Sequence, residues 1–458
     1  MKSIRRCQHI MSLFLVLFIA GMVTLVVKIQ RESAFYMMNS DKHVLGMVYD
    51  RNGDVLFDGS LKEGDTSKYE DNYFIDVGNL IGDDKGQMTN TLVAKNIEKL
   101  NNYSFSEGVV NEGGKAAIYT TLDHKANRTV YNAFAGNDGC AVAYNYKTGE
   151  ILVCTSLPSL DVTKGYSELK SFREGTLMSK NMSGTVPGST QKVSTVISAL
   201  EIMGPERLLS KTFSCSGKYT NKSGKVIDCH ELYGHGDLTL QQAVEKSCNP
   251  YFAQLVEDPD LDFEELKKMY TKLGYSVNGA EPEYIDIDGI ECQKASTNLT
   301  DPFDFQTQWG CMGQGDTLVS PIQLMMWQSA VANGTGKMTM PHLIKEVTNV
   351  KGKITETAST SYSNALFSEK TADSMKQILL TNGANNYTYL IRNHTVGVKS
   401  GTAQVQNGQK ENSLLVGFVT DPELPVAFCV VVEDRNNTYL TAEYITQVML
   451  DALTPPAN

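Results

Sequence analysis

A serine and a lysine lie three residues apart in the stretch VPGSTQKVST, residues 186–195. Ser189 follows a Pro-Gly turn, and after Lys192 apolar residues recur with the period of one buried helix face, at Val193, Val196, Ile197 and Leu200. Ser189 and Lys192 lie on that same face, where burial lowers the pKa of a lysine because it disfavours the charged form. A neutral lysine beside a serine hydroxyl is a candidate base for a nucleophile. The alternative is an ordinary helix start with Ser189 as its cap.

Two further stretches carry polar residues that could complete such a site. Ser247 and Asn249 follow a helix-forming segment and precede a proline, so they could equally cap a new helix. A second lysine lies in the strand-like stretch TVGVKSGTAQV, residues 395–405, which contains Lys399, Ser400, Gly401 and Thr402. A glycine within a strand often marks the close approach of another backbone or of a ligand. Each short motif is weak by itself, since such patterns also match by chance.

The elements that must position these residues alternate between strands and helices. Residues 44–60 predict a hairpin, residues 120–134 a helix, and residues 139–157 a strand, a turn and a second strand. Near the C-terminus, three β-branched and aromatic runs fit adjacent antiparallel strands, namely 395–405, 414–419 and 425–433. Strands at both ends with helices between them predict an α+β fold.

Composition and charge narrow the class of protein. The chain has 458 residues, of which 20% are charged and 41% hydrophobic, which is ordinary for globular protein with two or three domains. The formal net charge of -11 argues against a general nucleic-acid binder, because such a protein needs a basic face for phosphates.

The N-terminus predicts a membrane anchor. No charged residue occurs from Ile10 to Val27, and Lys2, Arg5 and Arg6 precede this span. The positive-inside tendency then keeps residues 1–9 as a cytoplasmic tail and places the chain beyond the anchor outside the cell membrane. The alternative is a cleaved signal peptide, although no clear small-residue cleavage site follows the apolar run.

The nine cysteines do not suggest a disulfide framework, because their number is odd and most have apolar neighbours. Cys140, Cys154 and Cys429 lie in strand-like runs and are expected in the core. Four other residues could form a closed tetrahedral zinc site, with His230 as a substitute for the histidine: Cys215, Cys229, His235 and Cys248. The alternative is a Cys215–Cys229 disulfide beside a buried Cys248.

With the motifs Ser-x-x-Lys, Ser-x-Asn and Lys-Ser/Thr-Gly in this order, the sequence resembles the penicillin-binding proteins. Further segments are similar to that family across residues 116–450, among them AVAYNYKTGEILVCTSLPSLD (141–161), GQGDTLVSPIQL (313–324) and LLVGFVTDPELPVAFCVVVE (414–433). YDRNGDVL (49–56) resembles the membrane-proximal segment of class B members, the monofunctional transpeptidases. Residues 28–115 are too few for the glycosyltransferase domain of class A members.

The resemblance implies a fold. It is the fold of serine β-lactamases and penicillin-binding protein transpeptidases, with a five-stranded antiparallel sheet flanked by helices, a helical subdomain and the active site between them. Residues 116–458 would form this transpeptidase domain, residues 28–115 a small pedestal and residues 10–27 the transmembrane anchor. A structural metal site with similar spacing also occurs in some class B relatives, and catalysis in the family needs no cofactor.

The resemblance also implies roles. Ser189 would attack a D-alanyl-D-alanine bond of a peptidoglycan stem peptide, or a β-lactam, while Lys192 takes its proton. Ser247 would relay that proton and Asn249 would hold the substrate amide. The terminal carboxylate would meet Lys399, Ser400 and Thr402, with Gly401 leaving room for the peptide. A membrane glycan polymerase is the partner that the family implies.

Two other functions share part of this pattern. A β-lactamase or β-lactam sensor has the same three motifs, but we find no Glu-x-x-Leu-Asn between the second and third motifs, which a class A β-lactamase needs for deacylation. An inactive scaffold for a glycan polymerase would not need to keep all five motif residues. Two departures from the family are Ser400 in place of threonine and ENSLLVGF, which is less aromatic than its counterpart.

Overall fold

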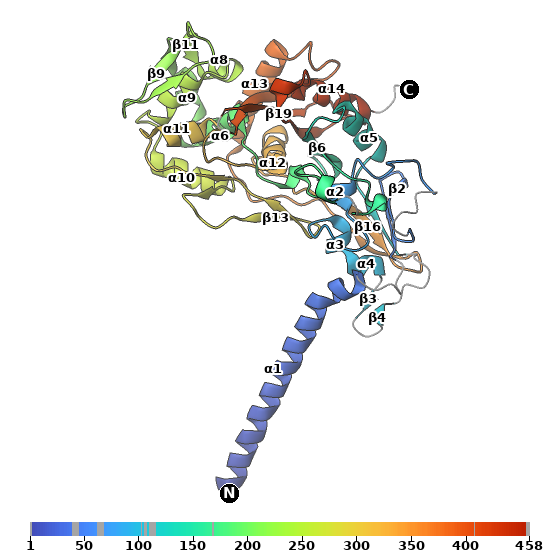
Figure 1. Cartoon of the computed structure of the whole chain (residues 1–458). Coiled ribbons are helices and arrows are strands. Elements are labelled where there is room, and N and C mark those ends of the chain that lie inside the picture. Colours follow the sequence, from blue (N-terminus) through green and yellow to red (C-terminus); the bar gives the residue numbers. More distant parts are fainter. Residues whose placement is uncertain are drawn as a thin grey trace.

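The computed structural model describes residues 2–38, 45–61, 68–101, 103–104, 108–109, 116–166, 169–406 and 408–454. Helix α1 (Lys2–Met38) projects from the body of the molecule as a long rod (Figure 1). Its segment Ile4–Ile29 has a mean hydropathy of 2.8 and is not buried by the other residues that the structure describes. By length and composition this segment can cross a membrane.

A first sheet lies on the side of the body nearest to α1 (Figure 1). Its strand order is β17-β16-β5-β1-β2. The strands are β1 (Met47–Tyr49), β2 (Val55–Asp58), β5 (Ala117–Thr120), β16 (Ile344–Thr348) and β17 (Ile354–Thr357). The predicted hairpin of residues 44–60 is therefore the β1–β2 pair. The proposed boundary at residue 115 divides the sequence, whereas this sheet joins strands from both sides of it.

Short elements complete this end of the molecule. The helices are α2 (Gly78–Ile81), α3 (Leu92–Lys95) and α4 (Ile97–Asn101), and the short strands are β3 (Tyr103–Ser104) and β4 (Gly108–Val109). Leu80, Leu92 and Leu100 are fully buried, so this end has its own apolar contacts with the rest of the core.

The second sheet is antiparallel throughout and has the order β18-β19-β20-β6-β7. Its strands are β6 (Gly139–Asn145), β7 (Ile151–Leu157), β18 (Val396–Val405), β19 (Lys410–Val419) and β20 (Val426–Val432). These strands match the predicted runs, because β-branched and aromatic residues suit a pleated surface covered on both faces. The five-stranded sheet that the resemblance implied is confirmed.

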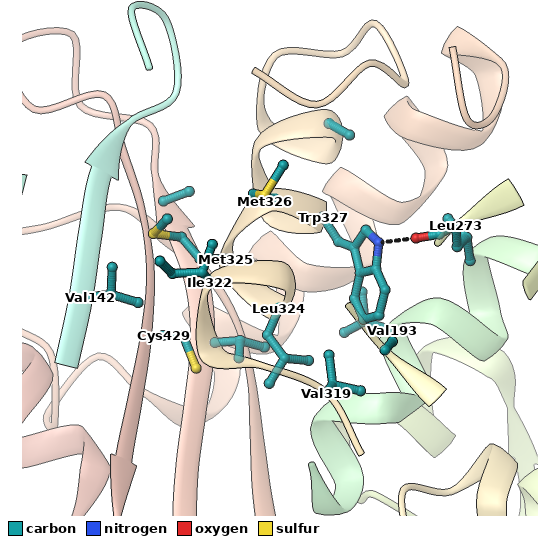
Figure 2. Close-up of a cluster of buried hydrophobic side chains, with 14 of the residues drawn as sticks. Val142, Val193, Leu273, Val319, Ile322, Leu324, Met325, Met326, Trp327 and Cys429 are labelled. Carbon is teal, nitrogen blue, oxygen red and sulfur yellow. Dashed lines mark hydrogen bonds between the residues drawn. The ribbon is translucent and has the colours of Figure 1, made fainter. Parts of the chain in front are cut away.

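Helices cover both faces of this sheet, and alternate side chains of each strand point to opposite faces. Along β6, Ala141 and Ala143 pack in the cluster formed with α5 (His124–Ala133) and α14 (Ala442–Leu453). Val142 points to the opposite face with Cys429, toward α12 (Pro321–Ala332) (Figure 2). Alternate residues of a strand face opposite sides, so both faces of this buried strand are apolar. Cys140, Cys154 and Cys429 are buried here, as expected.

A mostly helical lobe completes the body. Its helices are α6 (Lys192–Met203), α7 (Pro205–Ser210), α8 (Leu240–Glu245), α9 (Asn249–Val256), α10 (Phe263–Lys272), α11 (Phe305–Cys311) and α13 (Glu369–Asn386). Helix α12 joins this lobe to the sheet, since Trp327 packs beside Val193 and donates from its Nε1 to the Leu273 carbonyl at 3.0 Å (Figure 2). The two layers thus share one continuous apolar core.

The remaining elements are short. The paired strands are β8 (Thr212–Cys215) with β11 (Gly236–Thr239), β9 (Lys218–Thr220) with β10 (Val226–Asp228), β12 (Ser276–Val277) with β15 (Ser296–Thr297), and β13 (Tyr284–Ile287) with β14 (Ile290–Gln293). The 3-10 helices are η1 (Val162–Lys164), η2 (Leu169–Ser171), η3 (Lys180–Met182), η4 (Gly188–Gln191) and η5 (Arg435–Asn437).

Candidate active site

Ser189 lies on a 3-10 turn rather than within an α-helix. The turn is η4, and the regular helix α6 begins only at Lys192. Neither η4 nor α6 has a side-chain cap, so Ser189 does not serve as the N-cap that the alternative interpretation expected. Instead its Oγ lies 2.9 Å from Lys192 Nζ. The turn thus leaves the Ser189 hydroxyl partly exposed while its lysine partner starts a buried helix.

Helix α6 is more completely buried than its apolar stripe predicts. Besides that stripe, the polar residues Ser194, Thr195 and Ser198 are fully buried and have hydrogen-bond partners. The helix runs through the centre of the molecule, between α10 and α13, so every face of most of its length meets protein. Lys192 is accordingly 0% exposed.

The second motif lies beside Lys192. Lys192 Nζ is 2.8 Å from the Ser247 carbonyl oxygen, 3.2 Å from Ser247 Oγ and 2.7 Å from Asn249 Oδ1. Ser247 has a φ of 50°, in the left-handed region, at the junction between α8 and α9. That conformation is uncommon for a residue other than glycine and is found at functional sites. It turns both the carbonyl and the hydroxyl of Ser247 toward one amine.

The third motif reaches the same point from β18. Lys399 Nζ lies 3.0 Å from Ser247 Oγ and 2.8 Å from the Ser400 carbonyl oxygen. Lys399 is 2% exposed, and burial lowers its pKa to about 7. Burial lowers the pKa of Lys192 well below its usual value, and the charge of Lys399 lowers it further. Ser247 Oγ is therefore shared by two lysines whose pKa values are both lowered.

A cleft of about 750 Å³ opens over these groups. Its lining includes Ser189, Ser247, Asn249, Ser400, Gly401 and Thr402. In the described part of the chain, β18 stands at the edge of its sheet, paired only with β19. The backbone carbonyl of Thr402 points off that edge, because it accepts from Gln314 Nε2 at 3.3 Å. An extended ligand could pair with this free edge.

Three glycines bring the turn and the edge strand into contact. A Cβ on Gly188, whose φ is 53°, would lie 2.6 Å from the Thr402 carbonyl oxygen. A Cβ on Gly401 would lie 2.9 Å from the Pro187 carbonyl oxygen, and one on Gly313 would lie 1.8 Å from the Gly188 carbonyl oxygen. Gly401 is therefore needed for the approach of the η4 turn, which is the backbone alternative for a strand glycine.

Sequence reasoning missed several residues of the cleft. Trp309, Gln314, Glu411 and Arg435 all line it. Gln314 and the glycine before it lie in the segment 313–324, which is similar to the family but predicts no role for either residue. Glu411 begins ENSLLVGF, a segment that differs from the family but predicts no role for it, and no local pattern marks Arg435.

The predicted zinc ligands come together just behind the second motif. One ligand atom from each of Cys215, Cys229, His235 and Cys248 lies within 4.8 Å of the other three. The three cysteines are buried, and all nine cysteines of the chain are free thiols, so Cys215 and Cys229 are not joined. His235 is the histidine of the cluster, because its Nδ1 lies 3.5 Å from Cys229 Sγ, whereas His230 Nδ1 lies 4.0 Å away and His230 is not among the four clustered residues.

The strands β8 and β11 hold this cluster. Cys215 pairs with Gly236 across the two strands, and the His235 backbone donates to the Cys215 carbonyl at 3.0 Å. The Cys229 backbone donates to the Gly217 carbonyl at 2.9 Å. Cys248 lies between the two polar residues of the second motif. Three thiols and an imidazole at these separations suit a tetrahedral zinc ion.

Comparison with known proteins agrees with the fold. The model of the penicillin binding protein transpeptidase domain matches residues 139–452. Stage V sporulation protein D of Bacillus subtilis is 29% identical over 336 residues, covering 68% of this chain and 48% of that protein. Peptidoglycan D,D-transpeptidase MrdA of Acinetobacter baumannii is 24% identical over 351 residues, covering 69% of this chain and 51% of that protein. The chain thus spans about half the length of these curated relatives.

Solved structures extend the likeness to nearly the whole chain. The D,D-transpeptidase domain of a peptidoglycan glycosyltransferase from Eggerthella lenta has a TM-score of 0.71 at 21% identity and covers 89% of this chain and 97% of that one. The ceftriaxone acyl-enzyme complex of penicillin-binding protein A from M. tuberculosis has a TM-score of 0.75 at 16% identity and covers 90% of this chain and 98% of that one.

Proposed function

Because the chain belongs to the penicillin-binding protein transpeptidase family, we propose that it is a peptidoglycan D,D-transpeptidase that forms an acyl-enzyme on Ser189 and is a target of β-lactams. The observation that carries this proposal is the contact between Ser189 Oγ and the fully buried Lys192 Nζ at 2.9 Å. A serine becomes a nucleophile when a base beside it can take its proton.

The hydrogen bonds around Lys192 support its role as that base. A neutral amine has two hydrogen atoms to donate and one lone pair. The Ser247 carbonyl oxygen and Asn249 Oδ1 can only accept, so they use the two hydrogen atoms. The orientation of the Asn249 amide is consistent with this, since its Nδ2 donates to the Asp228 carbonyl at 3.3 Å. The lone pair then faces the Ser189 hydroxyl.

Acylation follows from this arrangement. As Ser189 Oγ attacks the carbonyl carbon of the penultimate D-alanine, its proton passes to Lys192 Nζ. Backbone N–H groups of Ser189 and Thr402 would stabilise the oxyanion, and one such donor is worth about 3 kcal/mol in serine hydrolases. Ser247 Oγ, 3.2 Å from Lys192 Nζ, would pass a proton to the leaving nitrogen. The peptide bond breaks, D-alanine leaves, and Ser189 carries the ester.

The second half-reaction reverses these transfers. The amine of a second stem peptide attacks the ester, its proton returns through Ser247 and Lys192, and Ser189 recovers its hydroxyl hydrogen as the new peptide bond forms. The donor peptide would lie along the free edge of β18, with its terminal carboxylate at the hydroxyls of Ser400 and Thr402. Lys399 is the nearby cation, because a bound carboxylate favours its charged form.

Penicillin labelling tests this proposal. We expect a fluorescent penicillin to label the purified protein at one site per chain, on Ser189. The Ser189→Ala variant should keep the circular dichroism spectrum and thermal unfolding of the wild type but take up no label. Labelling that survives this substitution would show that Ser189 is not the nucleophile, and an unlabelled wild type would favour a scaffold that only docks on other proteins.

We also propose that Cys215, Cys229, His235 and Cys248 bind a structural zinc ion. The support is the closeness of their ligand atoms and the free state of the three thiols. The ion would tether the segment of Ser247 and Asn249 to β8 and β11 and would take no part in the reaction. Structural zinc commonly contributes folding free energy in this way.

The setting of the enzyme is part of the proposal. Residues 10–27 would anchor the chain in the cell membrane, residues 1–9 would stay in the cytoplasm, and residues 28–115 would form the pedestal of an extracytoplasmic transpeptidase domain, residues 116–458. Parts of 28–115 lie outside the described residues. The support is the apolar segment of α1 and the basic residues before it. A membrane glycan polymerase would supply the strands that this enzyme cross-links.

A further inference from the structure

An arginine outside the three motifs reaches the cleft beside Thr402. Arg435 is the first residue of η5, the turn that follows β20, and it lines the same cleft as Ser189. Its Nη1 lies 3.5 Å from Thr402 Oγ1. Thr402 is one of the two hydroxyl residues proposed above to meet the terminal carboxylate of the donor peptide. The guanidinium therefore lies next to the place where a negative charge would bind.

The turn that carries Arg435 is held in place from the neighbouring strand. Asp434 has a φ of 51°, and its backbone N–H donates to Asn412 Oδ1 at 3.2 Å. Its carboxylate accepts from Asn437 Nδ2 at 2.8 Å and pairs with Lys410 Nζ at 3.1 Å. Asn412 is only 6% exposed and lies on β19, which pairs with β18 along its whole length. The backbone next to Arg435 is thus tied to the buried side chain of Asn412 on β19.

The side chain of Arg435 has one weak ion pair, which another anion could replace. Its ion pair with Glu411 has an Nε–Oε2 distance of 3.6 Å, longer than a hydrogen bond, and the two side chains are 44% and 28% exposed. Such an exposed pair contributes little free energy because water screens it. A guanidinium carries five N–H donors in a planar fork that matches a carboxylate.

We propose that Arg435 binds the terminal carboxylate of the donor peptide together with Thr402, and so selects donors that end in a free carboxylate. This inference rests on the proposed transpeptidase function and adds a specificity-determining residue to it. The same chemistry could come from a second source, a carboxylate on a diamino acid within the stem peptide. A small substrate that has only the terminal carboxylate separates the two sources.

The test uses a matched pair of thioester substrates and the full-length protein. N-benzoyl-D-alanyl-thioglycolate carries its single carboxylate on the leaving group, where the last D-alanine would carry it, and its methyl ester lacks the charge. We expect Arg435→Gln to lower kcat/KM for the acid about tenfold, mainly by raising KM. This is the low end of the range for a charge-assisted hydrogen bond, because the site is partly exposed to solvent and salt. Cleavage of the methyl ester should not change.

Two further variants sharpen the result. Arg435→Lys should recover part of the loss, since it keeps the charge but not the fork. Arg392→Gln removes an exposed arginine that does not line the cleft and should behave as the wild type. Equal loss with both substrates would mean that Arg435 only supports the fold of the turn, and this would overturn the proposal. Unchanged cleavage of the acid would also overturn the proposal. This holds even if cleavage of a complete stem peptide is slowed, because Arg435 would then bind the other carboxylate.

Penicillin labelling separates this inference from the proposed function. At saturating penicillin, wild type and Arg435→Gln should both label fully on Ser189, because the substitution slows acylation without removing the nucleophile. If the wild type labels and the Arg435→Gln variant cleaves the acid normally, only the role of Arg435 falls. If the wild type neither labels nor cleaves either thioester, the transpeptidase proposal falls and the inference falls with it.

Discussion

The direction of proton transfer at Ser189 depends on the charge of Lys192. A charged amine would have three hydrogen atoms and no lone pair, and could only donate to the Ser189 hydroxyl. Burial and the neighbouring Lys399 both lower the Lys192 pKa, so the structure favours the neutral form that can accept. In the proposed reaction, the three short motifs thus supply a nucleophile, a base and a shared hydroxyl, and each of these groups depends on the other two.

A pH profile tests this at the residue scale. Acylation by penicillin should slow as pH falls through the lowered Lys192 pKa, because protonation removes the lone pair. Lys192→Met should fold, slow acylation by about 10²-fold or more, and lose this pH dependence. The measurement is the second-order acylation rate constant from pH 5 to 10, with circular dichroism as the check on folding. A near-normal rate in Lys192→Met would show that another group is the base.

At the scale of elements, the site exists where three of them meet. The η4 turn presents Ser189, the α8–α9 junction presents Ser247 and Asn249, and the edge strand β18 presents Lys399. Glycines allow the first and third to touch. Behind the second, the β8–β11 pair brings Cys215 and His235 close to Cys229 and to Cys248 of the junction. Because the α8–α9 junction has a left-handed residue, it needs contacts on both sides to keep its shape.

Zinc analysis tests whether a metal ion stabilises the α8–α9 junction. We expect about one zinc ion per chain in protein purified without chelator. Removing the ion should lower the unfolding temperature and penicillin labelling together, because the metal would hold the segment that carries Ser247. Cys229→Ser should lose the zinc, whereas Cys292→Ser, a buried cysteine outside the cluster, should keep it. Metal-free protein with normal acylation, or a mapped Cys215–Cys229 disulfide, would disprove the site.

At the scale of the whole molecule, helix α1 and the first sheet lie on the same side of the body (Figure 1). Helix α1 leaves the body on the side of the β1–β2 hairpin, away from the helical lobe (Figure 1). The sheet on that side includes β16 and β17, which come from within the proposed transpeptidase domain. The proposed pedestal and the proposed transpeptidase domain are therefore joined by backbone hydrogen bonds.

Protease accessibility tests the orientation. Protease added to intact, wall-stripped cells should digest the chain beyond residue 28, because the basic residues before Ile10 would keep the N-terminus inside. A cytoplasmic marker protein should stay intact in the same cells, and detergent should expose it. Full protection of this chain until detergent is added would place the catalytic domain on the cytoplasmic side.

The sequence by itself was sufficient for the family, the five-stranded sheet and the list of candidate catalytic residues. The chemistry proposed for Ser189, Lys192 and Lys399 follows from their residue types, and the strands follow from runs of β-branched residues. Both are local properties of the sequence. The order of the three motifs carried the resemblance, and the resemblance added the expected fold and the roles of the motif residues, which no single motif could provide.

Only the tertiary structure decided how these residues meet. The 3-10 turn at Ser189, the choice of His235 over His230, the contact of Gly313 with Gly188 and the approach of Arg435 to Thr402 all join residues through packing. Local patterns do not encode such contacts, because they depend on how distant segments fill the same space. Gly401 lines the cleft, where it is expected to leave room for a peptide, and it also leaves room for the chain's own η4 turn.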